Sequence, residues 1–305
     1  MKAMNRNTLR QSVLLFMAAT IWGFAFVAQS VGMDYVGPYT FIAARNVIAL
    51  AVLLPWIVVT DNQRRKKNGQ ERQKKDHKLL LIGGICCGIC LFAASALQQI
   101  GMKYTTVGKA GFITAMYIVL VPVFGIFVKK KTGVKVWIAV AAALAGLYLL
   151  CMTKGDFQLQ KGDAYILGCA AVFALHILVV DHFSPLVDGV ELSCVQFAVN
   201  AVLGTILMML LEQPRMADLL AAWLPIVYAG ALSSGVGYTF QIIGQKGMNP
   251  TVASLILSLE SVISVLAGWL LLHQALTARE LAGCALVFAA IILVQLPGWH
   301  IRKGT

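Results

Sequence analysis

The chain alternates between long apolar runs and short polar connections along nearly its whole length. Each run has about 20 residues, the length that an α-helix needs to cross the hydrocarbon core of a bilayer. Backbone polar groups find no water there, so spanning runs of this kind form helices. The pattern predicts an all-α integral membrane protein with ten transmembrane helices, over residues 11–31, 38–59, 79–97, 106–128, 134–152, 163–182, 191–211, 222–244, 250–272 and 277–296.

The composition supports this prediction and excludes most other classes of protein. Apolar residues make up 59% of the 305 residues, charged residues make up 12%, and the mean hydropathy is +0.79. A soluble domain has about 25% charged residues, so an ordinary soluble enzyme and a disordered chain are both excluded. The lipid bilayer is therefore an expected partner of this chain.

The positive charge is concentrated between the second and third apolar runs. The formal net charge is +12, and eight Lys and Arg residues lie between Arg64 and Lys78 with no Phe, Trp or Tyr among them. Nucleic-acid sites combine charge with stacking residues or a folded motif, so no nucleic acid is expected as a partner. We interpret residues 60–78 as a basic cytoplasmic loop, with binding of lipid headgroups as the alternative.

The other basic residues predict the same orientation in the membrane. With the N-terminus inside, the inside segments carry 18 Lys and Arg residues and the outside loops carry 5. Basic residues are retained on the cytoplasmic side of a membrane. We therefore expect a multi-pass protein of the cell (inner) membrane with both termini in the cytoplasm.

Seven cysteines lie mostly inside the apolar runs. Cys86, Cys87 and Cys90 have a spacing that resembles a metal cluster, but no His or carboxylate lies near them in the sequence. We interpret them as small apolar packing residues. Neither a metal, nor another cofactor, nor a disulfide framework is expected.

The chain carries a weak internal repeat. Residues 98–125 match residues 241–268 at an offset of 143, with eight identities over 28 positions. In the earlier helices an offset of 151 pairs Trp22 with Phe173 and Arg45 with Gln196. These offsets indicate two five-helix repeats, within residues 1–152 and 163–305. Because five is odd, the second repeat is inverted in the membrane, which is a common plan of secondary transporters.

Four short motifs occur in a fixed order along the predicted helices. They are IWGF at 21–24, FIAAR at 41–45, GKAGFIT at 108–114 with its continuation through Tyr117 to Pro122, and ASLILSLE at 253–260. With these motifs the chain resembles the EamA-like transporters of the drug/metabolite transporter superfamily over nearly its whole length. The resemblance implies export or exchange of amino acids and other small metabolites. Many such relatives have proline where this chain has Ser261.

Glu260 is the strongest candidate for transport chemistry. An ionisable group inside the membrane costs about 2.5–3.5 kcal/mol, so it is a functional candidate by default. Glu260 lies ten residues into the ninth predicted helix, about 15 Å deep, and its repeat counterpart is Tyr117. We interpret Glu260 as a proton-coupling carboxylate or a counter-charge for a substrate amine. The alternative is a structural group held by neighbouring Ser or Gln side chains.

Three more ionisable residues lie within predicted helices. His176 could relay protons, although a lone His on an apolar helix more often forms a neutral hydrogen bond in the core. Lys109 lies near the outer end of its helix and either extends to water or meets a substrate carboxylate. Arg45, about 10 Å from the outer end of the second helix, either binds an anionic substrate group or pins helix ends through backbone carbonyls. For Arg45 we favour the structural role.

Aromatic and polar side chains complete the candidate site. Trp22, Tyr117 and Tyr238 would suit an apolar or aromatic substrate if they line a cavity, although Trp and Tyr also fill cores and interfacial belts. Further polar groups are expected to face protein or water rather than lipid: Gln98, Gln241, Ser233, Ser234, Ser254 and Ser258.

The sequence therefore favours a secondary transporter that moves a small amphipathic metabolite, such as an amino acid, by alternating access. Efflux or exchange is expected, with proton coupling as a possibility carried by Glu260. No Walker motif is present, and neither HExxH nor GxSxG occurs, so the chain is not expected to be an enzyme. A non-transporting membrane scaffold is the main alternative, and an integral membrane enzyme is a weaker one.

Overall fold

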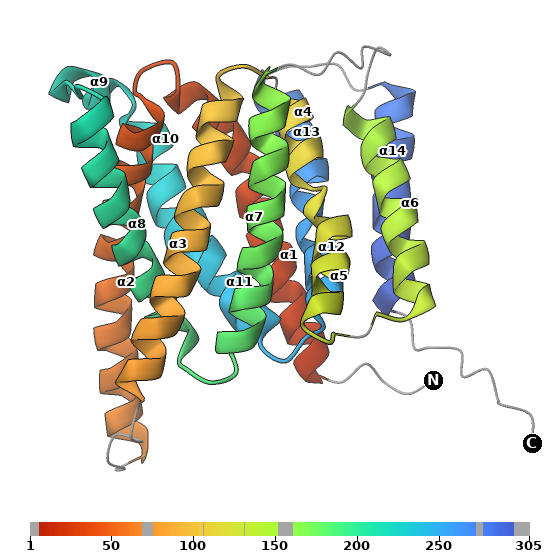
Figure 1. The fold of residues 1–305 in the computed structure, drawn as a ribbon, viewed down its shortest axis with the longest axis horizontal. Coiled ribbons are helices and arrows are strands. Elements are labelled where there is room, and N and C mark those ends of the chain that lie inside the picture. The colour runs from red at the N-terminus through yellow and green to blue at the C-terminus, as the bar shows by residue number, and fades with distance from the viewer. Residues whose placement is uncertain are drawn as a thin grey trace, which may run out of the picture.

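The computed structural model describes residues 6–68, 76–105, 107–130, 132–151, 161–272 and 277–295. Every regular element in these ranges is helical, and the long helices run roughly alongside one another (Figure 1). Within the described ranges, eight helical segments are long and apolar enough to cross a membrane, and two shorter apolar helices lie at 134–149 and 281–293. The prediction of an all-helical membrane protein is confirmed at this level.

The helices of the first half follow the predicted runs, with two differences. The fourth run, predicted as one helix over 106–128, is broken in two after Thr114. The segment predicted as a loop over 60–78 is partly helical, because the second helix continues to Asn68. The helices are α1 (Arg6–Gly32), α2 (Pro38–Asn68), α3 (His77–Met102), α4 (Val107–Thr114), α5 (Tyr117–Phe127) and α6 (Val134–Cys151).

The second half has a break at the corresponding place. The ninth run, predicted as one helix over 250–272, ends its first part at Leu257 and resumes at Leu259. A π-helix replaces the α-helix in the middle of the run predicted over 222–244. The elements are α7 (Lys161–Phe183), α8 (Gly189–Leu211), α9 (Met216–Ala221), α10 (Trp223–Val227), η1 (Tyr228–Gly237), α11 (Tyr238–Gln245), α12 (Pro250–Leu257), α13 (Leu259–Leu272) and α14 (Ala278–Gln295).

Polar side chains fix several helix starts. The carboxylates of Asp76 and Asp188 accept backbone N–H groups at the beginning of α3 and α8, and the Asn249 side chain does the same before Pro250. These are the residue types that satisfy the free N–H groups of a first helical turn. The start of α2 uses a distant residue, because Glu212 at the end of α8 accepts the N–H groups of Tyr39 and Thr40 at 3.0 and 2.8 Å.

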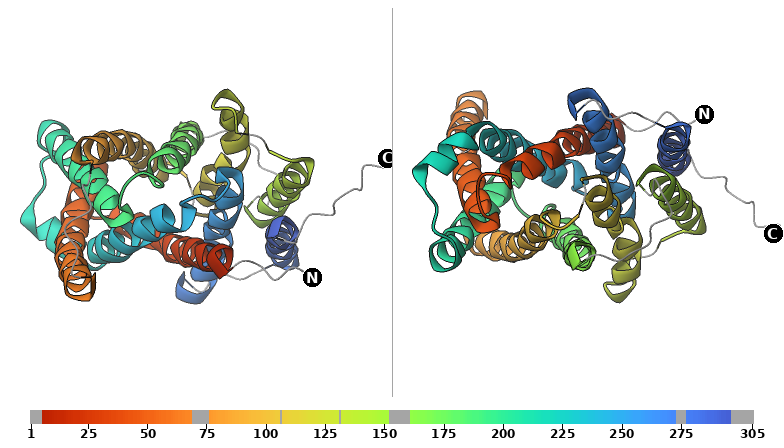
Figure 2. Two further views of the ribbon diagram at one scale, coloured as in Figure 1. Left: turned by 90° about the horizontal axis from the view of Figure 1, so that it is seen from below. Right: turned by 90° about the horizontal axis from the view of Figure 1, so that it is seen from above.

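The helices form an elongated bundle. Seen from either end, α6 and α14 pack together at one extreme, and α8 with α9 lies at the other (Figure 2). The helix α2 packs on α8 and η1, α3 packs on α7 and α8, and α1 packs on α13, η1 and α11. We call the end at which α1 begins the Arg6 end and the opposite end, where α2 begins, the Pro38 end. The last turn of α14 also lies at the Arg6 end (Figure 1).

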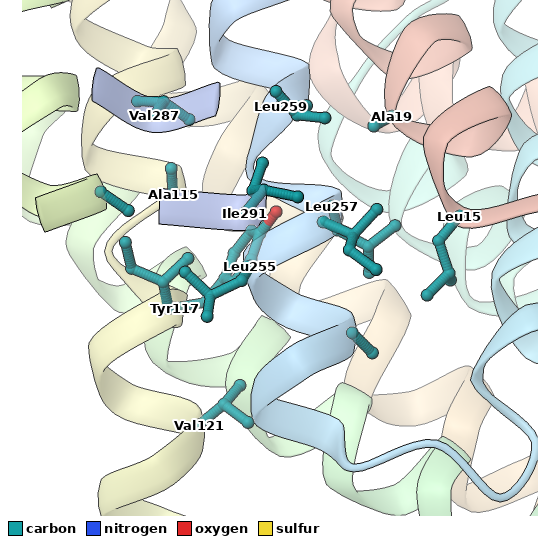
Figure 3. Close-up of a cluster of buried hydrophobic side chains, with 14 of the residues drawn as sticks. Leu15, Ala19, Ala115, Tyr117, Val121, Leu255, Leu257, Leu259, Val287 and Ile291 are labelled. Carbon is teal, nitrogen blue, oxygen red and sulfur yellow. The ribbon is translucent and has the colours of Figure 1, made fainter. Parts of the chain in front are cut away.

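The broken helices cross at the centre of the largest apolar cluster. Tyr117 on α5 faces Leu255 and Leu257 on α12, and side chains of α1 and α14 surround them (Figure 3). Gly23 lets α1 approach this crossing closely, because a Cβ there would lie 2.5 Å from the Ile263 side chain. The two helix breaks thus sit inside packed protein, which is where irregular backbone is tolerated in a membrane.

Several links close the Arg6 end. The Lys130 Nζ atom, just beyond α5, lies 2.6 Å from a carboxylate oxygen of Asp181 on α7. The Gln245 amide of α11 donates to the Ile177 carbonyl of α7 at 2.6 Å, and the Gln11 amide of α1 donates to the Lys246 carbonyl. These contacts tie α1, α5, α7 and α11 together at that end.

Candidate transport cavity

A cavity at the centre of the bundle brings together most of the residues that the sequence singled out. Side chains of α1, α2, α3, α4, α5, α7, η1, α11, α12 and α13 line it. They are Trp22, Phe26, Gln29, Arg45, Gln98, Thr114, Tyr117, Phe173, Ile177, Ser233, Tyr238, Gln241, Leu257 and Glu260. The cavity is therefore amphipathic, with one buried cation, one carboxylate and several aromatic rings.

Tyr117 and Glu260 meet at the two helix breaks. The Tyr117 hydroxyl donates to a Glu260 carboxylate oxygen at 3.0 Å, and the two residues are 3% and 5% exposed. Tyr117 is the first residue of α5, and Glu260 lies in the first turn of α13. The free N–H groups and dipole of a helix N-terminus favour a negative charge there. Glu260 is thus a buried carboxyl group at the start of a helix, beside the cavity.

Arg45 is a buried cation without an ion-pair partner in the described part of the chain. Its guanidinium donates to Ser95 Oγ at 2.9 Å and to Gln29 Oε1 at 3.4 Å, and its Nε atom has no hydrogen-bond partner among the described residues. These bonds go to side chains rather than to the backbone carbonyls that we expected a structural arginine to hold. A buried guanidinium with unused donors is suited to a carboxylate or phosphate group.

Aromatic rings form one wall of the cavity. The rings of Trp22 and Tyr238 lie 4.5 Å apart between centroids, and the Trp22 indole N–H donates to the Ser233 carbonyl at 3.3 Å. Phe197 packs edge-on against the other side of Tyr238. This wall offers apolar surface with few free polar atoms, which fits an apolar or aromatic portion of a solute.

Two glutamine amides line the cavity at positions related by the repeat offset of 143. The Gln98 amide donates to Thr114 Oγ1 at 3.3 Å, and the Gln241 amide donates to Gln245 Oε1 at 3.5 Å. The Gln241 Oε1 atom has no partner among the described residues. An unpaired buried acceptor is costly unless a ligand or water satisfies it, so this oxygen is available to a donor in the cavity.

His176 is not part of this lining, and Lys109 cannot be placed relative to it. His176 is fully buried behind Tyr238, with its ring centroid 6.1 Å from the tyrosine ring, and its Nε2 atom lies 3.2 Å from Gln196 Oε1. The backbone of Lys109 belongs to α4, but its side chain lies outside the described residues. Of the seven predicted site residues, the structure thus brings five to one cavity: Trp22, Arg45, Tyr117, Tyr238 and Glu260.

Several lining residues were not predicted from the sequence, namely Phe26, Gln29, Thr114, Phe173, Ile177 and Leu257. The repeat offsets could have found most of them. The offset of 151 pairs Phe26 with Ile177 as well as Trp22 with Phe173, and the offset of 143 pairs Thr114 with Leu257. No signal in the sequence marks Gln29, which is one polar residue among many.

Metal chemistry has no support in the described residues, where no three His, Cys, Asp or Glu side chains lie close enough to hold an ion. Cys86, Cys87 and Cys90 form no disulfide within the part of the chain that the structure describes.

Comparisons with known proteins agree with a transporter. The chain is 29% identical over 290 residues to an uncharacterized transporter of Archaeoglobus fulgidus, covering 92% of this chain and 84% of that protein. It is 24% identical to the uncharacterized transporters YoaV and YwfM of Bacillus subtilis strain 168, over 90% and 93% of this chain and 92% and 93% of those proteins. A crystal structure with 17% sequence identity superposes with a TM-score of 0.74 over 93% of this chain and 96% of that one, so the two share a fold.

The model of the EamA-like transporter family matches twice, over residues 10–152 and 160–296. The two matches together cover almost the whole chain. The chain therefore belongs to the EamA-like transporter family, within the drug/metabolite transporter superfamily.

Proposed function

We propose that this chain is a secondary transporter that moves a small metabolite, such as an amino acid, through the central cavity by alternating access. Efflux or exchange across the cytoplasmic membrane is the proposed direction. Membership of a transporter family supports the general class. The substrate and the mechanism are inferred from the cavity and its relation to the internal repeat.

One observation carries the proposal. Ten of the fourteen described residues that line the cavity fall into five repeat pairs, each related by an offset of 151 or 143. A site lined by equivalent residues of both repeats lies on the axis that relates them, where an alternating-access site is expected. The pairs are Trp22 with Phe173, Phe26 with Ile177, Gln98 with Gln241, Thr114 with Leu257, and Tyr117 with Glu260.

Helix contacts support two inverted repeats of five spans. The pairs α2–α8 and α6–α14 each join equivalent helices. The contact of α5 with α12 corresponds to that of α13 with α4, and the contact of α3 with α7 corresponds to that of α11 with α1. Gly101 approaches Gly162 at the Pro38 end, and their counterparts Gly244 and Gln11 approach each other at the Arg6 end. In this proposal the two shorter apolar helices complete a set of ten spans.

The charges and rings of the cavity support a zwitterionic solute with an apolar portion. Arg45 has unused donors for a carboxylate, and Glu260 supplies a counter-charge for an amine. Trp22 and Tyr238 provide an apolar wall. An amino acid has these three features, and an organic anion or a simple cation has only some of them.

Glu260 is the proposed coupling group. A carboxylate at the centre of the bundle, reached from either side in turn, exchanges a proton with one compartment at a time. Its only hydrogen bond among the described contacts comes from Tyr117, a neutral donor that leaves the proton state of the carboxylate free to change. We further propose that the Arg6 end faces the cytoplasm, since the basic segments lie at that end.

Flux into and out of proteoliposomes tests this function. Vesicles that hold purified protein are loaded with labelled amino acids, polyamines and nucleobases, and efflux is followed with and without a pH gradient. We expect selective flux of amino acids that quickens with the gradient. Absence of flux for the whole panel, from protein shown to be folded, would favour the scaffold alternative.

A further inference from the structure

Four of the residues that line the cavity have repeat counterparts that do not line it. The two repeats therefore contribute unequally to the site. Gln29 and Arg45 line the cavity, whereas their counterparts Val180 and Gln196 are excluded from it. Gln196 is fully buried. Arg45 lies seven residues from the Pro38 end of α2, and Gln196 lies seven residues from the Arg6 end of α8, each about 10 Å deep. The cavity thus extends from the centre toward the Pro38 end.

Gln196 is nevertheless equipped to bind a ligand. Its Oε1 atom lies 3.2 Å from His176 Nε2, and since a carbonyl oxygen only accepts, the imidazole nitrogen donates. This contact orients the amide and leaves the Gln196 Nε2 atom buried with no hydrogen-bond partner among the described residues. The cost of an unpaired buried N–H group is removed when an acceptor reaches it.

Tyr238 separates Gln196 and His176 from the cavity. Its ring lies against the His176 ring at 6.1 Å and against the Phe197 ring at 5.7 Å, while its other side contacts Trp22. The repeat counterpart of Tyr238 is Ser95, which accepts a hydrogen bond from Arg45. A small serine therefore lets Arg45 reach the cavity, while a bulky tyrosine covers the equivalent position in the other repeat.

We propose that Gln196, positioned by His176, is a second substrate subsite, which binds the carboxylate of the transported solute when the cavity opens toward the Arg6 end. This inference rests on the proposed function, because it requires the repeats to exchange their arrangements. In that exchange Tyr238 withdraws, Gln196 takes the place that Arg45 has now, and Arg45 becomes enclosed.

The two subsites differ in charge, and this difference has a measurable consequence. A guanidinium binds a carboxylate through charge-assisted hydrogen bonds, which are about twice as strong as the neutral bond that a glutamine amide offers. The solute is therefore held more tightly from the Pro38 end. We expect its half-saturating concentration to be about tenfold lower from that side than from the Arg6 side.

Access of a thiol reagent tests the second subsite without a substrate. In a background whose native cysteines are replaced, Gln196→Cys, Arg45→Cys and the control Gly133→Cys are exposed to a membrane-impermeant maleimide from each face. Gly133 is an exposed position between α5 and α6. We expect the thiol introduced at Gln196 to react from the same face as that at Gly133, and the thiol at Arg45 to react from the opposite face. An unreactive thiol at Gln196, beside a reactive one at Arg45, would overturn the second subsite.

Exchange of the two residues tests the binding role. With labelled leucine as the probe, half-saturating concentrations are measured from each face for the wild type, for His176→Ala and for the double variant Arg45→Gln with Gln196→Arg. We expect the double variant to reverse the preferred side, and His176→Ala to weaken binding from the Arg6 side alone. Equal affinities on both faces of the wild type would overturn the proposal.

The two experiments separate this inference from the proposed function. Leucine flux without a reaction of the thiol introduced at Gln196 would refute the second subsite and support the proposed transport function. Reaction of both thiols from opposite faces without flux of any amino acid would support the second opening of the cavity and refute the proposed substrate class.

Discussion

Tyr117 and Glu260 are 143 residues apart and joined by a hydrogen bond of 3.0 Å, and 143 is also the offset that relates the fourth and ninth predicted spans. Two equivalent positions of a repeated structure touch only near the axis that relates the repeats. The helix breaks after Thr114 and Leu257 obey the same offset. This hydrogen bond therefore marks the centre of the proposed transport pathway.

Replacement of Glu260 by Gln is expected to abolish the stimulation of flux by a pH gradient. The amide keeps the size and polarity of the side chain but neither takes up nor releases a proton at physiological pH. The measurement is solute flux from proteoliposomes with and without the gradient.

Tyr117→Phe is the matched control for that variant, because it removes only the hydrogen-bond donor. The gradient should still stimulate flux in the Tyr117→Phe protein. A Glu260→Gln protein that responds to the gradient as the wild type does would exclude a coupling role for this carboxylate.

Replacement of Arg45 by Gln is expected to raise the half-saturating concentration of a zwitterionic solute at least tenfold. Hydrogen bonds to a charged group contribute about 1.5–3 kcal/mol, and 1.4 kcal/mol corresponds to a factor of ten. Inhibition of transport by the corresponding amine, which lacks the carboxylate, should be nearly the same in the variant as in the wild type. Loss of protein yield with unchanged affinity would instead restore the structural role that the sequence favoured.

Replacement of Glu212 by Ala is expected to lower the free energy of unfolding by about 2 kcal/mol. The carboxylate accepts the backbone N–H groups of Tyr39 and Thr40 and the Thr40 hydroxyl, and so joins the end of α8 to the start of α2. Thermal unfolding in detergent measures the loss, and Glu212→Gln should lose less because one oxygen remains. Substrate selectivity should not change, since Glu212 does not line the cavity.

Replacement of Gly23 by Ala is expected to destabilise the protein by about 1–3 kcal/mol through overpacking. A Cβ at this position would lie 2.5 Å from Ile263 side-chain atoms and 2.9 Å from the Glu260 carbonyl oxygen. Gly133→Ala is the matched control, because no atom lies within 4 Å of a Cβ there. Similar melting temperatures for the two variants would mean that α1 and α13 pack less closely than described.

The sequence alone was sufficient for the class of protein and most helix positions. In the lipid bilayer, a long apolar run satisfies the hydrogen bonds of its own backbone only by forming a helix. The motifs around Trp22, Arg45, Tyr117 and Glu260 were also sufficient for the family. The breaks in the fourth and ninth spans were missed, because Ala115, Met116 and Ser258 are compatible with a helix and only the crossing of the two spans stabilises the interruptions there.

The tertiary structure decided which of the candidate residues share a site. Hydropathy gives the depth of a residue but not its rotation about the helix axis, so His176 and Arg45 were both candidates in the sequence. Packing of Tyr238 encloses His176, whereas Ser95 leaves Arg45 at the cavity. Depth follows from position along one helix, and membership of a cavity follows from contacts between helices that only the folded chain provides.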